Sequence, residues 1–322
     1  GFNKDLVAPA DGVITGSGMI DGRPVSLLSR DYTVLGGSTG KHGADKANRA
    51  VTQATEQGLP FVALQEGGGH RIQDGQDSRH FSAASPVFEF LARNSGWVPT
   101  AMAMLGQGFA GPTNWAALAD FVVMVRGQAT MGMAGPALVK AGLGQEIDKE
   151  ALGGAALQTN RYGISDLAVD TEDEALAAVR RFLSYLPSNA RQPLPIQEND
   201  DPITRAEEEL LEIIPASPRK SYDVRRIIEL ISDQGSVFEK KPSYARNIVT
   251  SFARLNGRPV GFVANQARHL AGMLDVKACE KASQFIGLCD AFGLPLVMLI
   301  DVPGFAIGSE AEKAGLGRRS GR

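Results

Sequence analysis

The feature that most constrains this 322-residue chain is an internal repeat with a spacing of 235 residues. The segment DGRPV at 21–25 returns as NGRPV at 256–260, and GLP at 58–60 returns at 293–295. Aligning 22–69 with 257–304 without a gap gives 14 identities in 48 positions. Unrelated segments of ordinary composition would share about 3. The chain therefore contains two copies of one structural unit.

Each copy predicts a strand, a helix and a second strand. Between the strands, apolar residues recur at i, i+3, i+7 and i+10, which is the spacing of one helix face. These positions are occupied in the first copy by Ala44, Ala47, Val51 and Ala54, and in the second by Cys279, Ala282, Ile286 and Cys289. We therefore expect the chain's two cysteines to be small buried packing residues without a reactive role. Strand–helix–strand units with continuously apolar strands favour an α/β fold with a mainly parallel sheet.

A proline-rich segment separates the two copies. Residues 186–220 contain six prolines and many charged residues, and the amphipathic sequence DVRRIIELISD follows. Such a composition is typical of a linker that runs over a surface. We therefore expect a first domain at 1–186, a linker at 187–221 and a second domain at 222–322.

Charge and cysteine content exclude several classes of protein. The formal net charge of −3 and the lack of a dense Lys/Arg run argue against nucleic-acid binding. No CxxC pair is present and the four histidines have no metal-ligand spacing, so we expect no metal site. The longest apolar runs are too short to cross a bilayer, and no secretory signal opens the chain. We therefore expect no membrane association and a cytoplasmic protein, with an organelle matrix as the alternative.

Two glycine-rich turns are candidates for a binding site. QEGGGHRIQDG at 65–75 follows an apolar strand, and LGQGFAGPTNW at 105–115 leads through Pro112 into a helix-like stretch. Pro suits the first turn of a helix, where the N–H groups of Ala110 and Gly111 would be free to form an oxyanion hole. A tight packing turn explains the same residues equally well. GGSTGKHG at 36–43 lacks the first glycine of a P-loop, because Leu35 stands there, and Lys41 is followed by His42.

Longer segments of the chain resemble a known family, and together they span nearly the whole sequence. They are EGGGHRIQDG, MAGPALVKAGLGQEIDKEALGGA, FLSYLPSN, NIVTSFARLNGRPVGFVANQ, LDVKACEKASQFIGLCDAF and LIDVPGFAIG. The chain resembles the carboxyltransferase (β) subunit of biotin-dependent acyl-CoA carboxylases, of the propionyl-CoA/acetyl-CoA carboxylase type. The resemblance implies two crotonase-like β-β-α spiral domains, in agreement with the repeat.

The resemblance also implies a function. It is the transfer of a carboxyl group from carboxybiotin to the α-carbon of an acyl-CoA, with the acyl-CoA on the first domain and biotin on the second. The biotin would be carried on a partner, with biotin carboxylase and biotin carboxyl carrier protein as partners. The resemblance further implies a homo-oligomer, a dimer or a higher assembly, of which the hexamer is the form that the family favours. It leaves open a decarboxylase acting on malonyl-type CoA thioesters, and the chain itself leaves open a noncatalytic CoA-binding or assembly subunit.

Site residues carry over by their positions in the matching motifs. The oxyanion hole falls on Ala110 and Gly111, where the family's Gly-Gly-Ala reads Ala-Gly-Pro. The substrate-binding positions are Gly67, Gly68, Gly69, His70, Arg71, Gly108 and Pro112, and the biotin-side positions are Asp301, Pro303, Gly304 and Phe305. His70 is a departure from the family's alanine. The repeat places a second hole at about residues 345–346, beyond Arg322, so we expect a chain truncated at both ends with an incomplete second domain.

Overall fold

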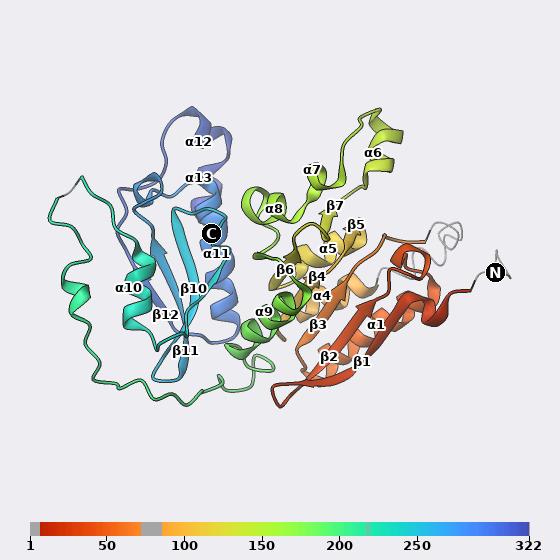
Figure 1. Cartoon of the computed structure of the whole chain (residues 1–322), viewed down its shortest axis with the longest axis horizontal. Coiled ribbons are helices and arrows are strands. Elements are labelled where there is room, and N and C mark those ends of the chain that lie inside the picture. The colour runs from red at the N-terminus through yellow and green to blue at the C-terminus, as the bar shows by residue number, and fades with distance from the viewer. Residues whose placement is uncertain (1–6, 72–85, 218, 322) are drawn as a thin grey trace. The chain divides into compact units, whose positions relative to one another are not determined.

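A computed structural model of the chain describes residues 7–71, 86–217 and 219–321 (Figure 1). The chain divides into two compact units. The first unit consists of Gly1–Leu183 with Ser188–Gln192, and the second of Ser184–Pro187 with Pro193–Arg322. The proline-rich segment from Pro193 onward thus packs with the second unit.

The first unit is built on a six-stranded sheet in the order β1-β2-β3-β4-β6-β8, in which every neighbouring pair except β1 and β2 is parallel. A separate parallel pair is formed by β5 and β7. The strands are β1 Val13–Ile20, β2 Arg23–Arg30, β3 Phe61–Gln65, β4 Thr100–Met104, β5 Gln107–Phe109, β6 Phe121–Val125, β7 Thr130–Gly132 and β8 Leu167–Val169. The α-helices are α1 Lys41–Gln57, α4 Pro86–Asn94, α5 Gly111–Leu118, α6 Pro136–Leu143, α7 Lys149–Gly153, α8 Ala155–Leu157 and α9 Glu172–Ser184.

The core of the first unit lies between this sheet and α1, α4 and α5. All five residues of β4 and of β6 are buried, as expected for central parallel strands covered on both faces. Helix α1 packs on β1 and β2 through the predicted face, because Ala44, Ala47, Val51 and Ala54 are all buried. The periodicity of the first repeat therefore predicted this interface correctly.

The second unit has a four-stranded sheet in the order β12-β11-β10-β9, with only the β11–β12 pair parallel. Its strands are β9 Phe238–Lys240, β10 Ile248–Leu255, β11 Arg258–Asn265 and β12 Leu296–Leu299. Its α-helices are α10 Val224–Ile231, α11 Val276–Ala291, α12 Ser309–Lys313 and α13 Leu316–Ser320. The expectation of a mainly parallel sheet is thus correct for the first unit and wrong for the described part of the second.

Helices cover both faces of the second sheet. Side chains alternate along a strand, so Val249 and Ala253 of β10 join the cluster around Ile228 of α10. Phe252, between them, faces Phe285 of α11 at a centroid distance of 5.0 Å. The near-continuous apolar sequence of β10 is a consequence of this two-sided burial.

The two repeats share their strand register. Val13 pairs with Arg30 between β1 and β2, and Ile248 pairs with Asn265 between β10 and β11, each residue shifted by 235. Both hairpins turn through two residues of positive φ, at Asp21-Gly22 and Asn256-Gly257. Asp-Gly and Asn-Gly are the residues that such type I′ turns favour. The repeat found in the sequence is therefore a repeat of backbone structure.

The predicted helix face of the second repeat is only partly correct. Cys279 and Cys289 are buried, as expected for packing residues. Ala282 and Ile286 are half-buried, whereas Ala278, Phe285 and Leu288 lie in the core. Helix α11 is thus turned by about one position, roughly 100°, relative to the predicted face. The large ring of Phe285 takes the central place against the sheet.

Candidate functional site

The candidate site lies at the carboxyl ends of β3 and β4. These strands are parallel neighbours, so the segments that follow them emerge at the same edge of the sheet. Residues 66–71 follow β3, while β5 and the start of α5 follow β4. Crevices at this edge are the usual ligand sites of parallel α/β sheets.

Gly67 is required by the close approach of another part of the same chain. A Cβ placed on Gly67 would lie 2.5 Å from the Cα of Gly37, and φ at Gly67 is 111°. Gly68 donates its N–H to the Gly36 carbonyl at 3.0 Å. The turn at 36–37 therefore accounts for Gly67 by packing, whereas a Cβ on Gly68 would meet only the Gly36 carbonyl oxygen, at 3.9 Å.

Gly69 lies beside the start of α5. A Cβ placed on Gly69 would be 3.0 Å from Ala110 Cβ and 3.5 Å from Gly111 N. The N–H groups of Gly69 and Gly111 make no hydrogen bond within the described residues. Both glycines line the same cavity. Two backbone donors from separate loops thus meet at one hollow of the first unit.

Ala110 differs from the expectation of two adjacent free donors. Its N–H donates to the Gly132 carbonyl of β7 at 2.8 Å. The residue has φ 64° and ψ −117°, a conformation that is unfavourable for a side chain larger than glycine. This turn directs the Ala110 N–H toward β7 and leaves Gly111 as the first N–H of the helix. The Ala110 N–H is therefore not free, and within the described part of the chain the unbonded N–H groups among the glycines that line this cavity are those of Gly69 and Gly111.

Hydrogen bonds of the Thr113 side chain stabilise the turn that leads into α5. Thr113 Oγ1 lies 2.8 and 2.9 Å from the carbonyl oxygens of Gly108 and Gly132, either of which can accept its single hydroxyl proton, and it accepts from the Gly132 N–H at 2.9 Å. A Cβ on Gly108 would lie 3.3 Å from Pro112 Cβ. Gly108 therefore serves packing, while Pro112 also lines the cavity. Sequence reasoning missed Thr113, whose position one residue after Pro112 at a helix start was the available signal.

The cavity between these elements has a volume of about 100 Å³. It is lined by Arg30, Thr39, Ala44, Ala47, Gly69, His70, Val87, Phe88, Gly111, Pro112 and Trp115. Most of the lining is apolar, and its polar side chains are those of Arg30, Thr39 and His70. Arg30 was not predicted, because it ends an apolar strand and belongs to no recognisable motif.

The two side chains predicted after Gly69 have different surroundings. His70 lines the cavity and forms an isolated parallel bridge with Thr39. Arg71 is turned away from the cavity, since its Nη1 lies 2.6 Å from Asp11 Oδ1 and its Nη2 donates to the Ser38 carbonyl at 3.1 Å. Arg71 therefore holds the loop in place, whereas His70 remains a candidate for contact with a ligand.

The predicted biotin-side residues follow β12 in the second unit. Asp301 accepts a hydrogen bond from Tyr222 Oη at 2.8 Å. Burial and this contact with the carboxylate raise the pKa of Tyr222 to about 12. Phe305 forms with Leu274 the bridge that Thr39 and His70 form in the first unit, each residue shifted by 235. The strand end of the second unit thus repeats the loop geometry of the first.

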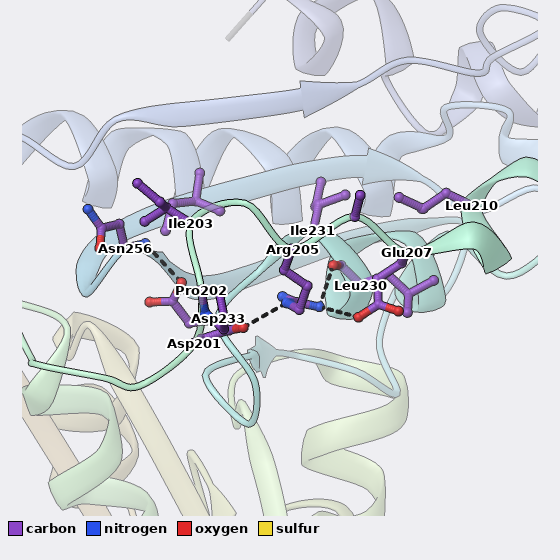
Figure 2. Close-up of a pocket in the computed structure, with 12 residues that line it drawn as sticks. Asp201, Pro202, Ile203, Arg205, Glu207, Leu210, Leu230, Ile231, Asp233 and Asn256 are labelled. Carbon is purple, nitrogen blue, oxygen red and sulfur yellow. Dashed lines mark hydrogen bonds and ion pairs between the residues drawn. The ribbon is translucent and has the colours of Figure 1, made fainter.

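A second hollow, of about 350 Å³, lies within the second unit (Figure 2). It separates the segment 201–210 from α10 and the turn at Asn256. Its charged groups bond to one another: Arg205 pairs with Asp201 and Glu207, each at 2.7 Å. Asp233 accepts from the N–H groups of Asn256 and Gly257 at 2.8 and 2.7 Å. Arg205 also donates to the carbonyls of Leu230 and Ser232, at 2.9 and 2.5 Å, and these two bonds attach the proline-rich segment to its unit. We therefore assign this hollow a packing role.

Among residues 7–71, 86–217 and 219–321, no group of three or more His, Cys, Asp or Glu side chains is arranged to hold a metal ion. No helix in the same part of the chain is both long enough and apolar enough to cross a membrane.

Comparison with known proteins identifies the family. Residues 1–321 match the family described as the carboxyl transferase domain. The chain belongs to this carboxyl transferase family. A similar member is the carboxyltransferase subunit of propionyl-CoA carboxylase from Haloferax mediterranei, 41% identical over 320 residues, which cover 99% of this chain and 61% of that protein. The alpha subunit of methylmalonyl-CoA decarboxylase from Veillonella parvula is 37% identical over 98% of this chain and 61% of its own length.

A solved carboxyl transferase has the same fold. Transcarboxylase 12S, in a structure with methylmalonyl-coenzyme A and methylmalonic acid bound, superposes with a TM-score of 0.93 at 38% identity. The match covers 98% of this chain and 61% of that one. The predicted fold class, α/β with two crotonase-like domains, is therefore confirmed. The chain spans about three fifths of the length of these relatives.

Proposed function

We propose that this carboxyl transferase chain moves a carboxyl group between biotin, carried on a partner protein, and the α-carbon of an acyl-CoA. The observation that carries the proposal is the pairing of the Gly69 and Gly111 N–H groups at one cavity. Neither N–H has a hydrogen-bond partner within the described residues. Unpaired backbone donors in a hollow are suited to an oxygen atom on which negative charge develops.

The chemistry of a thioester explains why such a pair is needed. Carbon–carbon bond formation next to a thioester passes through an enolate, whose charge rests on the thioester oxygen. Two N–H donors stabilise that oxygen more strongly than the neutral carbonyl, which lowers the barrier. Gly111 also begins α5, so the helix dipole adds positive potential at the same place. The chain itself therefore supplies positioning and charge stabilisation.

The second unit is the proposed biotin side. Carboxybiotin would supply the carboxyl group and, after transferring it, a base for the α-proton. Gly304 has φ 136° with open space where a Cβ would stand, and Phe305 beside it is 49% exposed. An open backbone next to an exposed ring fits a flat ureido ring. We propose that Asp301, Pro303, Gly304 and Phe305 hold it, and that the domains at 1–186 and 222–322 divide the two substrates between them.

The reverse direction is the second candidate. The Veillonella parvula relative is a methylmalonyl-CoA decarboxylase subunit, nearly as similar as the carboxylase subunits. The same enolate forms when a malonyl-type thioester loses its carboxyl group, so Gly69 and Gly111 serve both directions equally. The partner, biotin carboxylase or a decarboxylase complex, would determine the direction.

Assembly is part of the proposal. Transcarboxylase 12S forms a hexamer. We propose that the native protein is likewise a homo-oligomer that works with a biotin carboxyl carrier protein. Sedimentation of the native protein tests this point, and a stable monomer at micromolar concentration would contradict it.

The test of function adds one methyl group at Gly111, beside the proposed oxyanion hole. Gly111→Ala adds a Cβ where nothing lies within 4 Å, so the fold can accept it, but the methyl enters the space beside the donor. We expect a fall of about 100-fold in kcat/KM for carboxyl exchange between a malonyl-type CoA thioester and biotin, because displacing the reacting group by about 1 Å has that effect. Gly142→Ala in α6, where a Cβ also meets nothing, is the matched control and should keep full activity.

Three outcomes of this test are informative. Exchange by the native protein that Gly111→Ala impairs and Gly142→Ala preserves supports the proposal. Tight binding of CoA thioesters without exchange, in the presence of the carrier, would favour a noncatalytic CoA-binding subunit. Failure to bind any CoA thioester would overturn the proposed function.

A further inference from the structure

Arg30 is the one charged side chain that is both buried and part of the candidate cavity, among the described residues. It is the last residue of β2, and only 7% of it is exposed. It lines the cavity with Gly69 and Gly111, the proposed donors to the thioester oxygen. A guanidinium at this place therefore adjoins the space in which an acyl group would lie.

The hydrogen bonds of Arg30 are incomplete. Its Nη1 donates to Thr39 Oγ1, and its guanidinium carbon lies 5.5 Å from the centre of the Trp115 ring. Its Nε is buried and has no hydrogen-bond partner within the described residues. The contacts with Thr39 and Trp115 hold the guanidinium in position without satisfying its donors, of which arginine has five.

No carboxylate in the described part of the chain pairs with Arg30. Asp11 is close enough to raise the pKa of Arg30 by its charge, but Asp11 is already engaged. Its Oδ1 lies 2.6 Å from Arg71 Nη1, and its Oδ2 accepts from the Gly43 N–H at 2.7 Å. Burial has the larger effect and lowers the pKa of Arg30 to about 10, so the group is still charged at neutral pH.

A buried guanidinium without a carboxylate is costly for a folded protein. Burial of an unpaired charge is strongly unfavourable unless a partner of opposite charge approaches. Guanidinium groups bind carboxylates through two parallel hydrogen bonds, a geometry that ammonium groups do not provide. The cavity therefore contains half of a carboxylate-binding site.

The rest of the cavity suits a short acyl group. Ala44, Ala47, Val87 and Phe88 line it with apolar surface. An apolar cavity of about 150 Å³ can hold a benzene ring. The volume of about 100 Å³ therefore accommodates a group of a few carbon atoms.

We propose that Arg30 is a specificity-determining residue: it binds a carboxylate on the acyl group, and this contact sets how strongly the site prefers a dicarboxylic acyl-CoA to the methyl-ended one. The inference rests on the proposed function and names a residue that controls its preference among acyl groups. The carboxylate has two possible sources. It is either the carboxyl group on the α-carbon of a malonyl-type thioester, or a carboxyl group at the far end of the acyl chain.

Two matched pairs of thioesters test the inference on the native protein. Propionyl-CoA and malonyl-CoA differ by one methyl-to-carboxylate exchange at three carbons, and butyryl-CoA and succinyl-CoA differ likewise at four. Calorimetry gives the dissociation constant of each. We expect the carboxylate to bind about 10-fold more tightly, or better, in at least one pair, since hydrogen bonds to charged groups are worth this much. Tightening in the first pair assigns Arg30 to the α-carboxylate, and tightening in the second assigns it to the distal one.

Variants then show whether Arg30 causes the preference. Arg30→Gln keeps a polar group for Thr39 and should abolish the preference while leaving the affinity of the methyl-ended thioester within about 3-fold. Arg30→Lys keeps the charge without the planar fork and should retain a few-fold preference. Arg93→Gln removes an exposed arginine that pairs with Glu89 and should change nothing.

The outcomes separate this inference from the proposed function. Binding of methyl-ended thioesters with no advantage for either carboxylate overturns the inference and leaves the function intact. A preference that persists in Arg30→Gln also overturns it. Failure of all four thioesters to bind overturns the function itself. Should Arg30→Gln not fold, the native comparison and Arg30→Lys still give a decision.

Discussion

Arg71 and Asp11 form a buried ion pair that joins the loop after β3 to the segment before β1. Arg71 Nη1 lies 2.6 Å from Asp11 Oδ1, and the two side chains are only 7% and 9% exposed. Asp11 also accepts from the Gly43 N–H near the start of α1, at 2.7 Å. One carboxylate thus connects three segments, and two of them, α1 and the loop after β3, line the candidate cavity.

Asp11→Ala should destabilise the first unit by about 3–5 kcal/mol, because removing one partner leaves a buried guanidinium uncompensated. Both tryptophans, Trp97 and Trp115, belong to this unit, so urea unfolding followed by tryptophan fluorescence reports on it. Asp170→Ala is the control: its pair with Arg126 at 2.7 Å is largely exposed, and we expect a loss below about 1 kcal/mol. Equal effects of the two variants would contradict the structural role of Arg71.

Gly69→Ala and Ala110→Gly should compensate each other. The Cβ added at position 69 would lie 3.0 Å from Ala110 Cβ, so we expect the single variant to lose about 1–3 kcal/mol. Ala110→Gly removes that Cβ and relieves a positive φ, which is worth about 1 kcal/mol. A double-mutant cycle should give a coupling of at least 0.5 kcal/mol, roughly the lower limit for residues in contact. Gly69→Ala combined with Gly142→Ala should be additive, and additivity in both cycles would contradict the contact.

Lys281→Met should loosen the loop at 241–248 in the second unit. The ammonium of Lys281, on a residue only 2% exposed, donates to the carbonyls of Lys241, Tyr244 and Ile248 at 2.8, 2.9 and 2.7 Å. Methionine keeps the bulk but removes the charged donor that these three carbonyls share. The Lys241 carbonyl keeps a second partner, the Tyr244 N–H. We expect a cost of about 3 kcal/mol. Hydrogen exchange of peptides covering 241–248 should accelerate about 100-fold. Lys313→Met, at an exposed lysine, should leave this exchange unchanged.

Cys289 should make the stability of the second unit fall in alkaline solution. Burial raises the pKa of its thiol from 9 to about 12. The unfolded chain therefore loses this proton before the folded chain does, so the stabilisation is complete below about pH 9 and declines toward about pH 12. Hydrogen-exchange stability of the second unit, measured from pH 8 to 10.5, should decline less in Cys289→Ala than in the native protein. Identical slopes would show that the thiol is not shielded.

The sequence alone determined the overall architecture because its evidence was local and repeated. Spacing along α1 identifies its buried face, and the 235-residue repeat identifies two copies of one unit. Even the hairpins are encoded locally, since Asp21-Gly22 and Asn256-Gly257 are type I′ turn signals. The strands before these turns, β1 and β10, lie outside the strand–helix–strand pattern that the repeat predicts.

The candidate site was only partly predictable, since a glycine motif does not reveal whether a ligand or another segment of the chain lies against it. Gly67 and Gly69 are two residues apart in one motif, yet the first faces Gly37 and the second faces Ala110. Ala110 was expected to offer a free N–H. In the structure this N–H donates to the Gly132 carbonyl of β7, which lies beside the turn. Such pairings join residues far apart in the chain, so only the folded structure decides them.

Arg30 shows the same limit most clearly. The sequence around Arg30 predicts only the end of an apolar strand. The proposed role of Arg30 depends on its contacts with Thr39 and Trp115 and on the cavity that it shares with two glycines of distant segments. The amino-acid sequence by itself determined the family, the repeat and the apolar periodicity of the helices and strands, because these features depend on the order of residues along the chain. The tertiary structure decided which N–H groups are free and which charge is buried without a partner, because hydrogen-bond satisfaction and burial depend on the whole fold.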